Sequence, residues 1–373
     1  MRIGVPTEIK ANENRIGLVP ESVSELIKSG HQVYVQRGAG TGIQASNEDF
    51  VDAGAIILEA GADIYEQSEL IVKVKEPQPA ECLMLKPHHT LFTYLHLAAD
   101  VALTNTLVTS GSTAIAYETV SADDGSLPLL APMSEVAGRL SIQAGAHALE
   151  REHGGYGILL GGVAGVRPAQ VVVIGGGVVG TNAIQMALGM GAMVTVLDKS
   201  LSRLRELDMI FGGRLNTIYA TQQALDDYVT TADLVIGAVL VPGATAPRVV
   251  NCDMVKRMKS GAVIVDVAID QGGCFETSHP TTHAEPTYIV EDVVHYCVAN
   301  MPGAVPRTST YALNNATLPY VLSLADFGCL QALERDPHLL AGLNVHRGKI
   351  TEPNVARAVG LEYCPGKDAL AGT

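Results

Sequence analysis

The chain has 373 residues, of which 47% are hydrophobic and 17% are charged, and its formal net charge is −14 at pH 7. This length exceeds one ordinary core and predicts two domains, and the acidic balance argues against a nucleic-acid-binding protein, which needs a basic face. The six cysteines are scattered without a Cys-x-x-Cys pair, which argues against a zinc knuckle or disulfide framework and favours a reduced, cytoplasmic protein.

The first 130 residues alternate between strand and helix patterns. This series is typical of a βαβ domain with a parallel sheet. No glycine-rich turn follows the first strand, where Pro6, Thr7 and Glu8 stand instead, so this part is expected to bind a substrate rather than a nucleotide. The predicted strands cover residues 3–5, 32–36, 55–58, 70–74, 91–95 and 113–117, and the predicted helices cover 21–29, 47–53 and 101–109.

A long helix is predicted next, from Ser134 to about His153. Ser134 stands where a helix N-cap is expected, and its hydroxyl suits that role. The alternative is that this hydroxyl contacts a cofactor, and the pattern alone favours the cap. A glycine-dense stretch over residues 154–165 is predicted to be a connector.

The most informative stretch is an apolar strand over residues 171–174 that runs directly into Gly175-x-Gly177-x-x-Gly180. A helix and a second strand follow, and the second strand ends at Asp198. The first glycine allows a tight turn, the second lets a pyrophosphate approach the backbone, and the third lets the helix pack on the strand. The helix N-terminus adds free N–H groups and the positive end of its dipole. The stretch therefore predicts a dinucleotide site.

Asp198 favours NAD over NADP, because a carboxylate at this place holds the ribose hydroxyls and repels a 2′-phosphate. Two nearby cations, Lys199 and Arg203, weaken this preference for NAD. Both are also explained as solvated residues at the start of a helix. The alternation continues beyond them and completes a doubly wound sheet of about six strands. Its further strands are predicted over residues 217–219, 234–239, 262–267, 287–290 and 295–298, and its helices over 178–189, 222–230 and 253–258.

Ligands of such sheets bind at the carboxyl ends of the strands, which directs attention to residues 239–243, 266–270 and 299–303. A second long helix is predicted over 310–324. If it returns to the first domain, residues 131–306 form an NAD-binding Rossmann domain inserted in a substrate domain. That substrate domain would then consist of residues 1–130 and 307–373.

Three polar side chains of the first domain follow apolar strands, namely Arg15, Lys75 and His96. A cationic pair such as Arg15 and Lys75 suits a small carboxylate substrate, and an imidazole transfers protons near neutral pH. Ordinary roles stay open at this point. Arg15 is then paired with Glu8 or Glu13 on the surface, Lys75 is a solvated strand end, and His96 is a core histidine.

Five segments of the chain stand in a specific order: GVPTEIKANENRIGLVP, VKVKEP, TYLH, VVVIGGGVVG and NMPGAVPRTST. In this combination the chain resembles the alanine dehydrogenase family, which includes the transhydrogenase α subunit. The resemblance runs from Met1 to beyond Thr317. It implies an α/β fold of two Rossmann-like doubly wound domains, joined by long helices, and a homohexamer.

The resemblance implies a reversible NAD-dependent oxidative deamination of L-alanine to pyruvate and ammonia. By resemblance, Arg15 holds the substrate carboxylate and Lys75 contacts the carboxylate or the carbonyl oxygen of pyruvate. His96 is the proton donor and acceptor, and Asp270 assists proton transfer or orients the water or ammonia. The resemblance also favours a cofactor contact for the hydroxyl of Ser134 over the role of helix N-cap. The implied cofactor contacts are Ser134, Gly175, Gly177, Val178, Val179, Gly180, Asp198, Arg203, Val239, Leu240, Val267, Ala268, Ile269, Asp270, Val298, Ala299, Asn300 and Met301.

Three alternatives stay open. A dehydrogenase of the same superfamily that joins lysine and a keto acid in a secondary amine would need an open cleft. Alanine, in contrast, needs a small pocket with residues such as Tyr94, Leu130 and Met133. A soluble NAD-binding subunit like that of transhydrogenase, or a crystallin-like or regulatory NAD binder, would need no amino-acid site.

No metal site is predicted, because Arg15 and Lys75 supply the charge that the reaction needs. His279 and His283 have the i,i+4 spacing of helical metal ligands, but Pro280 between them argues against a helix there. The N-terminus has no apolar core of a targeting segment. We therefore expect small-molecule partners and self-association, without a nucleic-acid or membrane partner.

Overall fold

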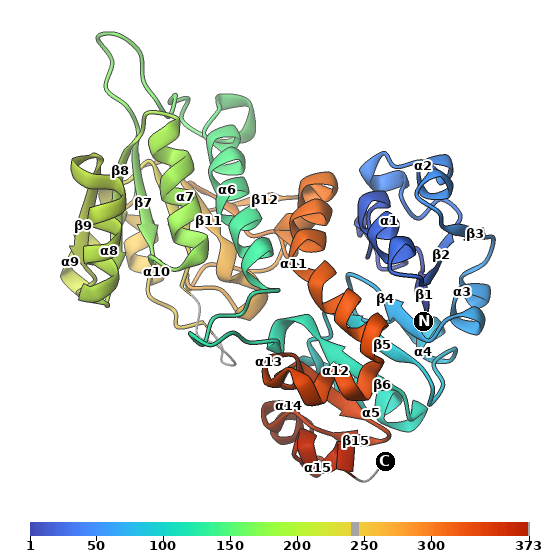
Figure 1. Ribbon diagram of the computed structural model, residues 1–373. Helices are drawn as coiled ribbons and strands as arrows, with labels where there is room; N and C mark the ends of the chain where they lie inside the picture. Colours follow the sequence, from blue (N-terminus) through green and yellow to red (C-terminus); the bar gives the residue numbers. More distant parts are fainter. Residues whose placement is uncertain (240–245, 372–373) are drawn as a thin grey trace. The chain divides into compact units, whose positions relative to one another are not determined.

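The computed structural model describes residues 1–239 and 246–371, which divide into two compact units (Figure 1). Unit 1 comprises Met1–Met133 with Val305–Thr373, and unit 2 comprises Ser134–Ala304. The chain leaves unit 1 within helix α6 (Ala131–Ala148) and returns just before helix α11 (Pro306–Phe327). Unit 2 is thus an insertion in the sequence of unit 1.

Unit 1 is built on an eight-stranded sheet with the order β15-β14-β6-β5-β4-β1-β2-β3. The six strands from β6 to β3 are parallel, and β14 and β15 add an antiparallel edge. The strands are β1 (Arg2–Val5), β2 (Gln32–Gln36), β3 (Ile56–Leu58), β4 (Leu70–Val72), β5 (Thr90–Thr93), β6 (Thr113–Ala116), β14 (Leu343–His346) and β15 (Lys349–Ile350). The helices are α1 (Pro20–Lys28), α2 (Asn47–Asp52), α3 (Gly61–Gln67), α4 (Pro79–Cys82), α5 (Val101–Ser110), α11, α12 (Cys329–Arg335), α13 (Pro337–Ala341), α14 (Pro353–Val359) and α15 (Gly366–Ala371).

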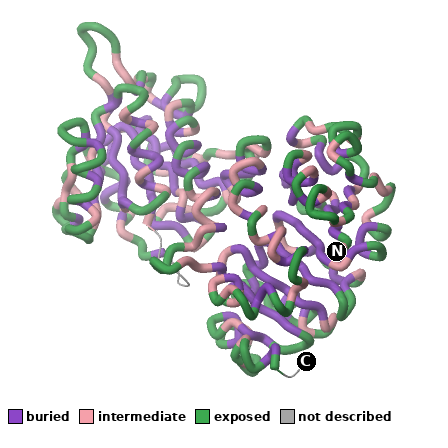
Figure 2. Tube along the Cα trace, viewed as in Figure 1, coloured by how far each residue is buried: buried purple, intermediate pink, exposed green. Residues whose placement is uncertain are grey.

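Both faces of this sheet are buried, because successive side chains of a strand point to opposite faces. In β5, Phe92 packs in one apolar cluster with α1 and α11, and Leu91 packs in another with α3 and α5. Figure 2 shows buried trace in the interior of unit 1, while the edge strand β3 has no buried residue. Hydrophobic runs with helices on both sides are the pattern of a doubly wound fold, so the predicted fold class is confirmed for this unit.

Unit 2 has a seven-stranded sheet with the order β12-β13-β11-β10-β7-β8-β9. Six strands are parallel and β12 pairs antiparallel at the edge. The strands are β7 (Gln170–Ile174), β8 (Met193–Asp198), β9 (Leu215–Tyr219), β10 (Leu234–Gly237), β11 (Val263–Asp266), β12 (Thr287–Val290) and β13 (Val293–Tyr296). The helices besides α6 are α7 (Val178–Gly189), α8 (Leu201–Phe211), α9 (Gln222–Thr231) and α10 (Cys252–Lys256).

The structure corrects the predicted long helix at both ends. Helix α6 begins at Ala131, where Pro132 suits a first turn, so Ser134 lies inside the helix and the N-cap prediction is wrong. The helix ends at Ala148, and a separate 3₁₀ turn, η4, covers Arg151–His153. The sequence patterns also miss α3, which buries only Ile64 and Tyr65 and therefore shows no helical period.

Among the described residues, no single helix has both the length and the apolar character needed to span a membrane. The bent pair of α11 and α12, which meet at 119°, passes that test of length and composition only when the two are taken together. Side chains of both helices, including Val321, Leu324 and Leu333, belong to the apolar core of unit 1.

Candidate active site and dinucleotide site

Polar side chains follow four neighbouring strands of unit 1. Arg15 lies in the segment after β1, Lys75 after β4, His96 after β5 and Glu118 after β6. These strands are adjacent and parallel in the order β6-β5-β4-β1. Parallel strands end at the same edge of a sheet, so the four segments converge beside the point where the strand order reverses, which is where such folds bind ligands.

Arg15 is buried and its side chain is 2% exposed. Its Nε donates to Glu13 Oε1 at 2.6 Å, its Nη2 donates to Glu13 Oε2 at 2.6 Å, and its Nη1 donates to Met133 Sδ at 3.0 Å. Burial raises the pKa of Glu13, but the hydrogen bonds and charge of Arg15 outweigh it and bring that pKa to about 2. The surface pairing considered for Arg15 is therefore wrong, since the pair with Glu13 is buried and held in a two-pronged geometry.

Lys75 is half-buried rather than a solvated strand end, so that interpretation is also wrong. In the described part of the chain no carboxylate or other acceptor pairs with its ammonium group. Burial lowers the pKa of Lys75 below its ordinary value, and the positive charge of Arg15 lowers it further. A partly buried ammonium group beside a second cation favours an anion that lies close to both.

A buried ion network supports the backbone that carries Lys75. Lys73 Nζ lies 3.0 Å from Glu8 Oε2 and 2.7 Å from Glu81 Oε1, and all three side chains are at most 4% exposed. Glu8 Oε1 also accepts the N–H of Val74 at 2.6 Å, so it holds the chain one residue before Lys75. Glu8 therefore pairs with Lys73. The pairing of Glu8 with Arg15, which was one interpretation of the sequence, is wrong.

His96 is half exposed, so the core-histidine interpretation is wrong. Its backbone is in the left-handed region with φ of 51°, which is rare for a residue with a side chain. Glu118 holds this conformation, because its Oε1 accepts the N–H of His96 at 2.6 Å and the N–H of Leu95 at 3.1 Å. The same Oε1 lies 3.8 Å from His96 Nδ1. The His96 ring is parallel to the ring of Tyr94, with centroids 5.9 Å apart.

Glu118 is the site residue that the sequence patterns missed. It is the first charged residue after the predicted strand over residues 113–117, the same signal that singled out Lys75 and His96. Of the small pocket proposed from the sequence, Tyr94 and Met133 are buried and Leu130 is half-buried. Tyr94 is anchored by its hydroxyl, which donates to the carbonyl of Leu129 at 2.5 Å.

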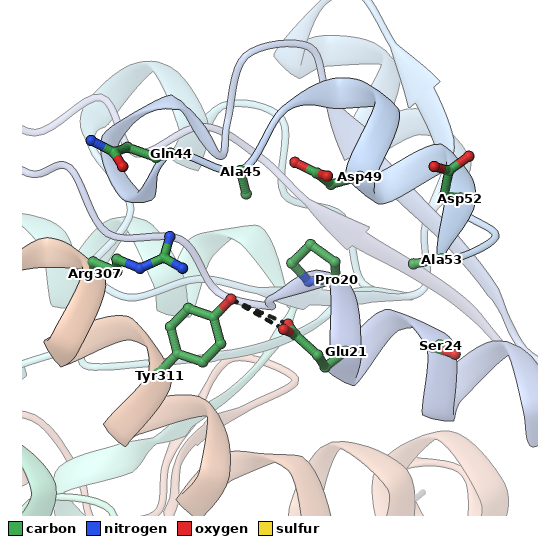
Figure 3. A pocket seen from close by; sticks show the side chains of 10 residues that line it. All are labelled: Pro20, Glu21, Ser24, Gln44, Ala45, Asp49, Asp52, Ala53, Arg307 and Tyr311. Atoms are coloured by element: carbon green, nitrogen blue, oxygen red, sulfur yellow. Dashed lines mark hydrogen bonds between the residues drawn. The ribbon is translucent and has the colours of Figure 1, made fainter.

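A separate hollow of unit 1 does not coincide with these residues (Figure 3). Its volume is about 490 Å³, and its acidic side chains include Glu21, Asp49 and Asp52. Its cation, Arg307, donates to the carbonyl of Ile43 at 2.6 Å. Acidic lining disfavours a carboxylate substrate or a pyrophosphate, so we do not place the active site in this hollow.

In unit 2, the strand order reverses between β7 and β10, and the glycine motif directly follows β7. Gly175 has a φ of 98°, and a Cβ there would lie 2.6 Å from the carbonyl oxygen of Ala238. A Cβ at Gly180 would lie 1.9 Å from the oxygen of Gly175, so only glycine lets α7 pack this close. A Cβ at Gly177 would meet nothing within 4 Å, and no side chain caps the start of α7. This open, uncapped helix start fits a pyrophosphate.

Asp198 ends β8 beside this turn. Its Oδ2 accepts the N–H of Gly176 and its Oδ1 accepts the N–H of Ser200, each at 2.7 Å, so the carboxylate is fixed in place. Arg203 is bound across the same turn, donating from Nε to the oxygen of Gly176 at 2.7 Å and from Nη2 to Thr181 Oγ1 at 2.7 Å. Its Nη1 donates to Glu206, so the guanidinium of Arg203 is occupied by protein acceptors, whereas Lys199 is exposed beside the start of α8, as a solvated helix start implies.

Two other strand ends of unit 2 hold further predicted residues. Asp270 lies on the 3₁₀ turn η6 (Val267–Gln271) after β11, exposed and without a hydrogen-bond partner among the described residues. The buried Asp266 fixes this turn by accepting the N–H groups of Ala268 at 3.1 Å and Cys274 at 2.9 Å. Burial raises the pKa of Asp266, although its hydrogen bonds oppose the change.

The segment after β13 contains Val298, Ala299, Asn300 and Met301, of which Val298 and Met301 are buried and the other two half-buried. His283 Nε2 lies 3.1 Å from the carbonyl oxygen of Asn300. His279 and His283 lie outside any helix, so the i,i+4 geometry considered for them does not occur.

The remaining predicted cofactor residues lie on the same unit. Val239 follows β10, between the ends of β7 and β11, while Leu240 lies outside the described residues. Val178 and Val179 form the first turn of α7. Ser134, half-buried in the first turns of α6, is the first residue of unit 2.

Comparison with known proteins decides the family. The model of the "Alanine dehydrogenase/PNT, N-terminal domain" matches residues 4–137, and that of the C-terminal domain matches residues 141–353. The chain belongs to the alanine dehydrogenase/PNT family. It is 61% identical over 363 residues to an alanine dehydrogenase of Halomonas elongata, covering 97% of this chain and 98% of that one. The resemblance stated from the sequence is confirmed.

Solved structures agree with this assignment. An L-alanine dehydrogenase superposes with a TM-score of 0.94 at 53% identity, covering 96% of this chain and 99% of the other. A transhydrogenase from Sinorhizobium meliloti superposes with a TM-score of 0.81 at 22% identity, covering 95% and 99%, which shows a shared fold only. Both predicted doubly wound domains are therefore confirmed.

Proposed function

We propose that this protein catalyses the reversible, NAD-dependent oxidative deamination of L-alanine to pyruvate and ammonia. The observation that carries this conclusion is the similarity to alanine dehydrogenases over nearly the whole of both chains. The cationic group of Arg15 and Lys75 supports it, because a transhydrogenase-like subunit or a regulatory NAD binder has no need of a carboxylate site.

Arg15 and Lys75 bind the substrate carboxylate in this proposal. Arg15 is held rigidly by Glu13 and is already desolvated, so binding a carboxylate costs little reordering. Lys75, which forms no direct ion pair among the described residues, adds a second charge to the carboxylate or to the carbonyl oxygen of pyruvate. Their charge also stabilises the oxyanion that develops when the carbonyl forms.

His96 moves the protons. When bound, NAD supplies the acceptor for the hydride that leaves the α-carbon of alanine. The substrate is then an iminium ion, and as water adds to its carbon, His96 takes the proton from the water oxygen. His96 returns that proton to the nitrogen, the C–N bond breaks and ammonia leaves, and His96 accepts the proton of the remaining hydroxyl as the carbonyl of pyruvate forms. Glu118 is a positioning residue that fixes the His96 backbone and faces the imidazolium form.

In unit 2, we propose that the glycine turn and the start of α7 bind the pyrophosphate and that Asp198 binds the adenosine ribose. Because Arg203 is occupied by Gly176, Thr181 and Glu206, it is poorly disposed to bind a 2′-phosphate. We assign Asp270 to orienting the water or ammonia, since its carboxylate is exposed on a turn that Asp266 holds rigid. The backbone and side chains of Val239, Val267–Asp270 and Val298–Met301 would line the nicotinamide side.

The decisive experiment measures NADH formation by the purified protein at alkaline pH with a panel of amino acids. L-alanine is expected to give the fastest reduction of NAD, and NADP is expected to react poorly. Activity with a different amino acid, and none with L-alanine, would overturn the proposed substrate but leave the dehydrogenase class intact. NAD binding without any amino-acid-dependent reduction would favour the non-enzymatic alternatives.

We also propose a cytoplasmic homohexamer, which rests on the family resemblance. All six cysteines lie in the described residues and are free thiols, as a reducing compartment favours. Light scattering after gel filtration would measure the mass of the assembly, and a mass other than six chains would reject the hexamer.

A further inference from the structure

Three potential metal ligands gather where α6 ends and η4 follows. Glu150 Oε2 lies 3.5 Å from His147 Nδ1 and 3.7 Å from His153 Nε2. One ligand atom from each of the three side chains lies within 4.8 Å of the others. The two imidazole rings lie 3.7 Å apart between centroids, at an angle of 45°. None of these residues takes part in the proposed reaction.

The break in the helix creates this cluster. In a continuous α-helix, residues six apart would be rotated by about 120° and separated by about 9 Å along the axis, so His147 and His153 would not meet. The helix instead stops at Ala148, and η4 is closed by Gly154 with a φ of 94°. The N–H of Gly155 then donates to the carbonyl of Glu150 at 3.2 Å, which folds the turn back on the end of α6.

The spacing of the ligand atoms suits a tetrahedral ion. Zinc bonds of about 2.0–2.2 Å to imidazole nitrogen and carboxylate oxygen place neighbouring ligand atoms roughly 3.4 Å apart. The two distances to Glu150 Oε2 are close to this value, and the three ligand atoms all lie within 4.8 Å of one another. Two histidines and a glutamate also form a known zinc donor set that leaves a fourth position open.

The surroundings also favour a cation. The C-terminal end of α6 carries the negative end of the helix dipole, and the chain as a whole is acidic. The side chains are 62%, 61% and 41% exposed for His147, Glu150 and His153, so a metal ion can enter from solvent and keep a water ligand. We propose that these three residues form a zinc site that links the end of α6 to η4, apart from the residues assigned to catalysis.

The test is zinc titration of the EDTA-treated full-length protein by calorimetry, with thermal melting as a second measurement. The wild type is expected to bind one zinc ion per chain through this cluster and to melt at a higher temperature with zinc. His147→Ala and His153→Ala should each weaken that binding by about tenfold or more. Glu150→Gln should weaken it as well, and His88→Ala, an exposed histidine elsewhere, should leave it unchanged.

Alanine-dependent NADH formation by the zinc-free variants checks their folding, and it should match the wild type because the three side chains lie on the surface. The proposal fails if the wild type binds no zinc. It also fails if the double variant His147→Ala/His153→Ala binds zinc with the stoichiometry and affinity of the wild type, which would assign the ion to other groups such as the half-buried thiols.

Discussion

The carboxyl ends of the strands carry different chemical groups in the two sheets. In unit 1, the strand ends are backed by buried ion pairs, Arg15 with Glu13 and Lys73 with Glu8 and Glu81. In unit 2, the equivalent edge offers glycines and backbone N–H groups, with ordered carboxylates at Asp198 and Asp266. Both edges lie where the strand order reverses, so the fold supplies the place and the side chains decide the ligand.

The comparison shows what each kind of ligand requires. A small carboxylate has few atoms, so its recognition depends on charge that is fixed and desolvated before binding. A dinucleotide is long and carries its charge on the pyrophosphate, so it needs room beside the backbone and a helix dipole. Burying an ion pair costs desolvation energy. In unit 1 the buried pairs lie where they position the cationic side chains that are proposed to bind the substrate.

The largest effect is expected at His96. His96→Ala should lower kcat by roughly 10²- to 10⁴-fold, the usual contribution of general acid–base catalysis, while NAD affinity stays unchanged. Because φ is 51° at this position, His96→Asn serves as a control, since asparagine tolerates the left-handed region better than alanine. Both variants should show this loss of kcat by steady-state kinetics. An active asparagine variant would show that backbone strain, not loss of the imidazole, inactivates the alanine variant.

The next effect is on the stability of unit 1. Lys73→Met leaves Glu8 and Glu81 buried without their cation, which should lower the free energy of unfolding by about 3–5 kcal/mol. The exposed pair of Lys28 and Glu25 provides the control, because Lys28→Met should cost no more than about 1 kcal/mol. Urea unfolding measures both. Equal losses would mean that the buried network contributes no more than a surface pair.

A substitution in the glycine turn of unit 2 should change the affinity for NAD and leave the stability of the fold unchanged. Gly177→Ala adds a methyl group that meets no protein atom within 4 Å, so folding should be unaffected. The methyl group would occupy the place of the pyrophosphate and weaken NAD binding by about tenfold or more. Gly189→Ala, at the last residue of α7 and equally free of contacts, should leave NAD affinity unchanged. Fluorescence titration with NADH compares the two, and equal affinities would place the pyrophosphate elsewhere.

Glu118 should have a smaller effect on turnover. Glu118→Gln keeps an oxygen for the backbone N–H groups but removes the charge near His96 Nδ1, and kcat should fall about tenfold, equivalent to about 1.4 kcal/mol. The KM for L-alanine should stay unchanged, because Glu118 acts on His96 and not on the substrate carboxylate. A KM that rises as kcat falls would indicate a purely structural role.

The smallest effect is expected in the pH dependence of pyruvate binding. The pKa of Lys75 is lowered by burial and by Arg15, so its charge is present at low pH and is lost as pH rises through that lowered pKa. The KM for pyruvate should therefore rise at alkaline pH. Lys75→Arg keeps the charge and should move this rise to higher pH. An identical pH dependence in both proteins would assign the titration to another group.

Much of unit 2 follows from local patterns. The helix over residues 178–189 and the strand over 287–290 are found at the predicted bounds. The glycine spacing also indicated its turn, because steric limits at Gly175 and Gly180 are set by neighbours close in the chain or in the adjoining strand. The short helix α3 and the ends of α6 were not predictable in this way, since tertiary packing and the turn after Ala148 decide them.

The sequence by itself determined the parallel parts of the two sheets, the dinucleotide turn and the identity of Arg15, Lys75 and His96 as residues that follow strands. Only the tertiary structure decided which side chains meet. Glu8 binds Lys73, Glu13 binds Arg15, and Glu118 holds His96. Partners that come from different strand ends are selected by burial and strand order, because a desolvated charge must find an opposite charge in space and spacing along the chain does not encode that distance.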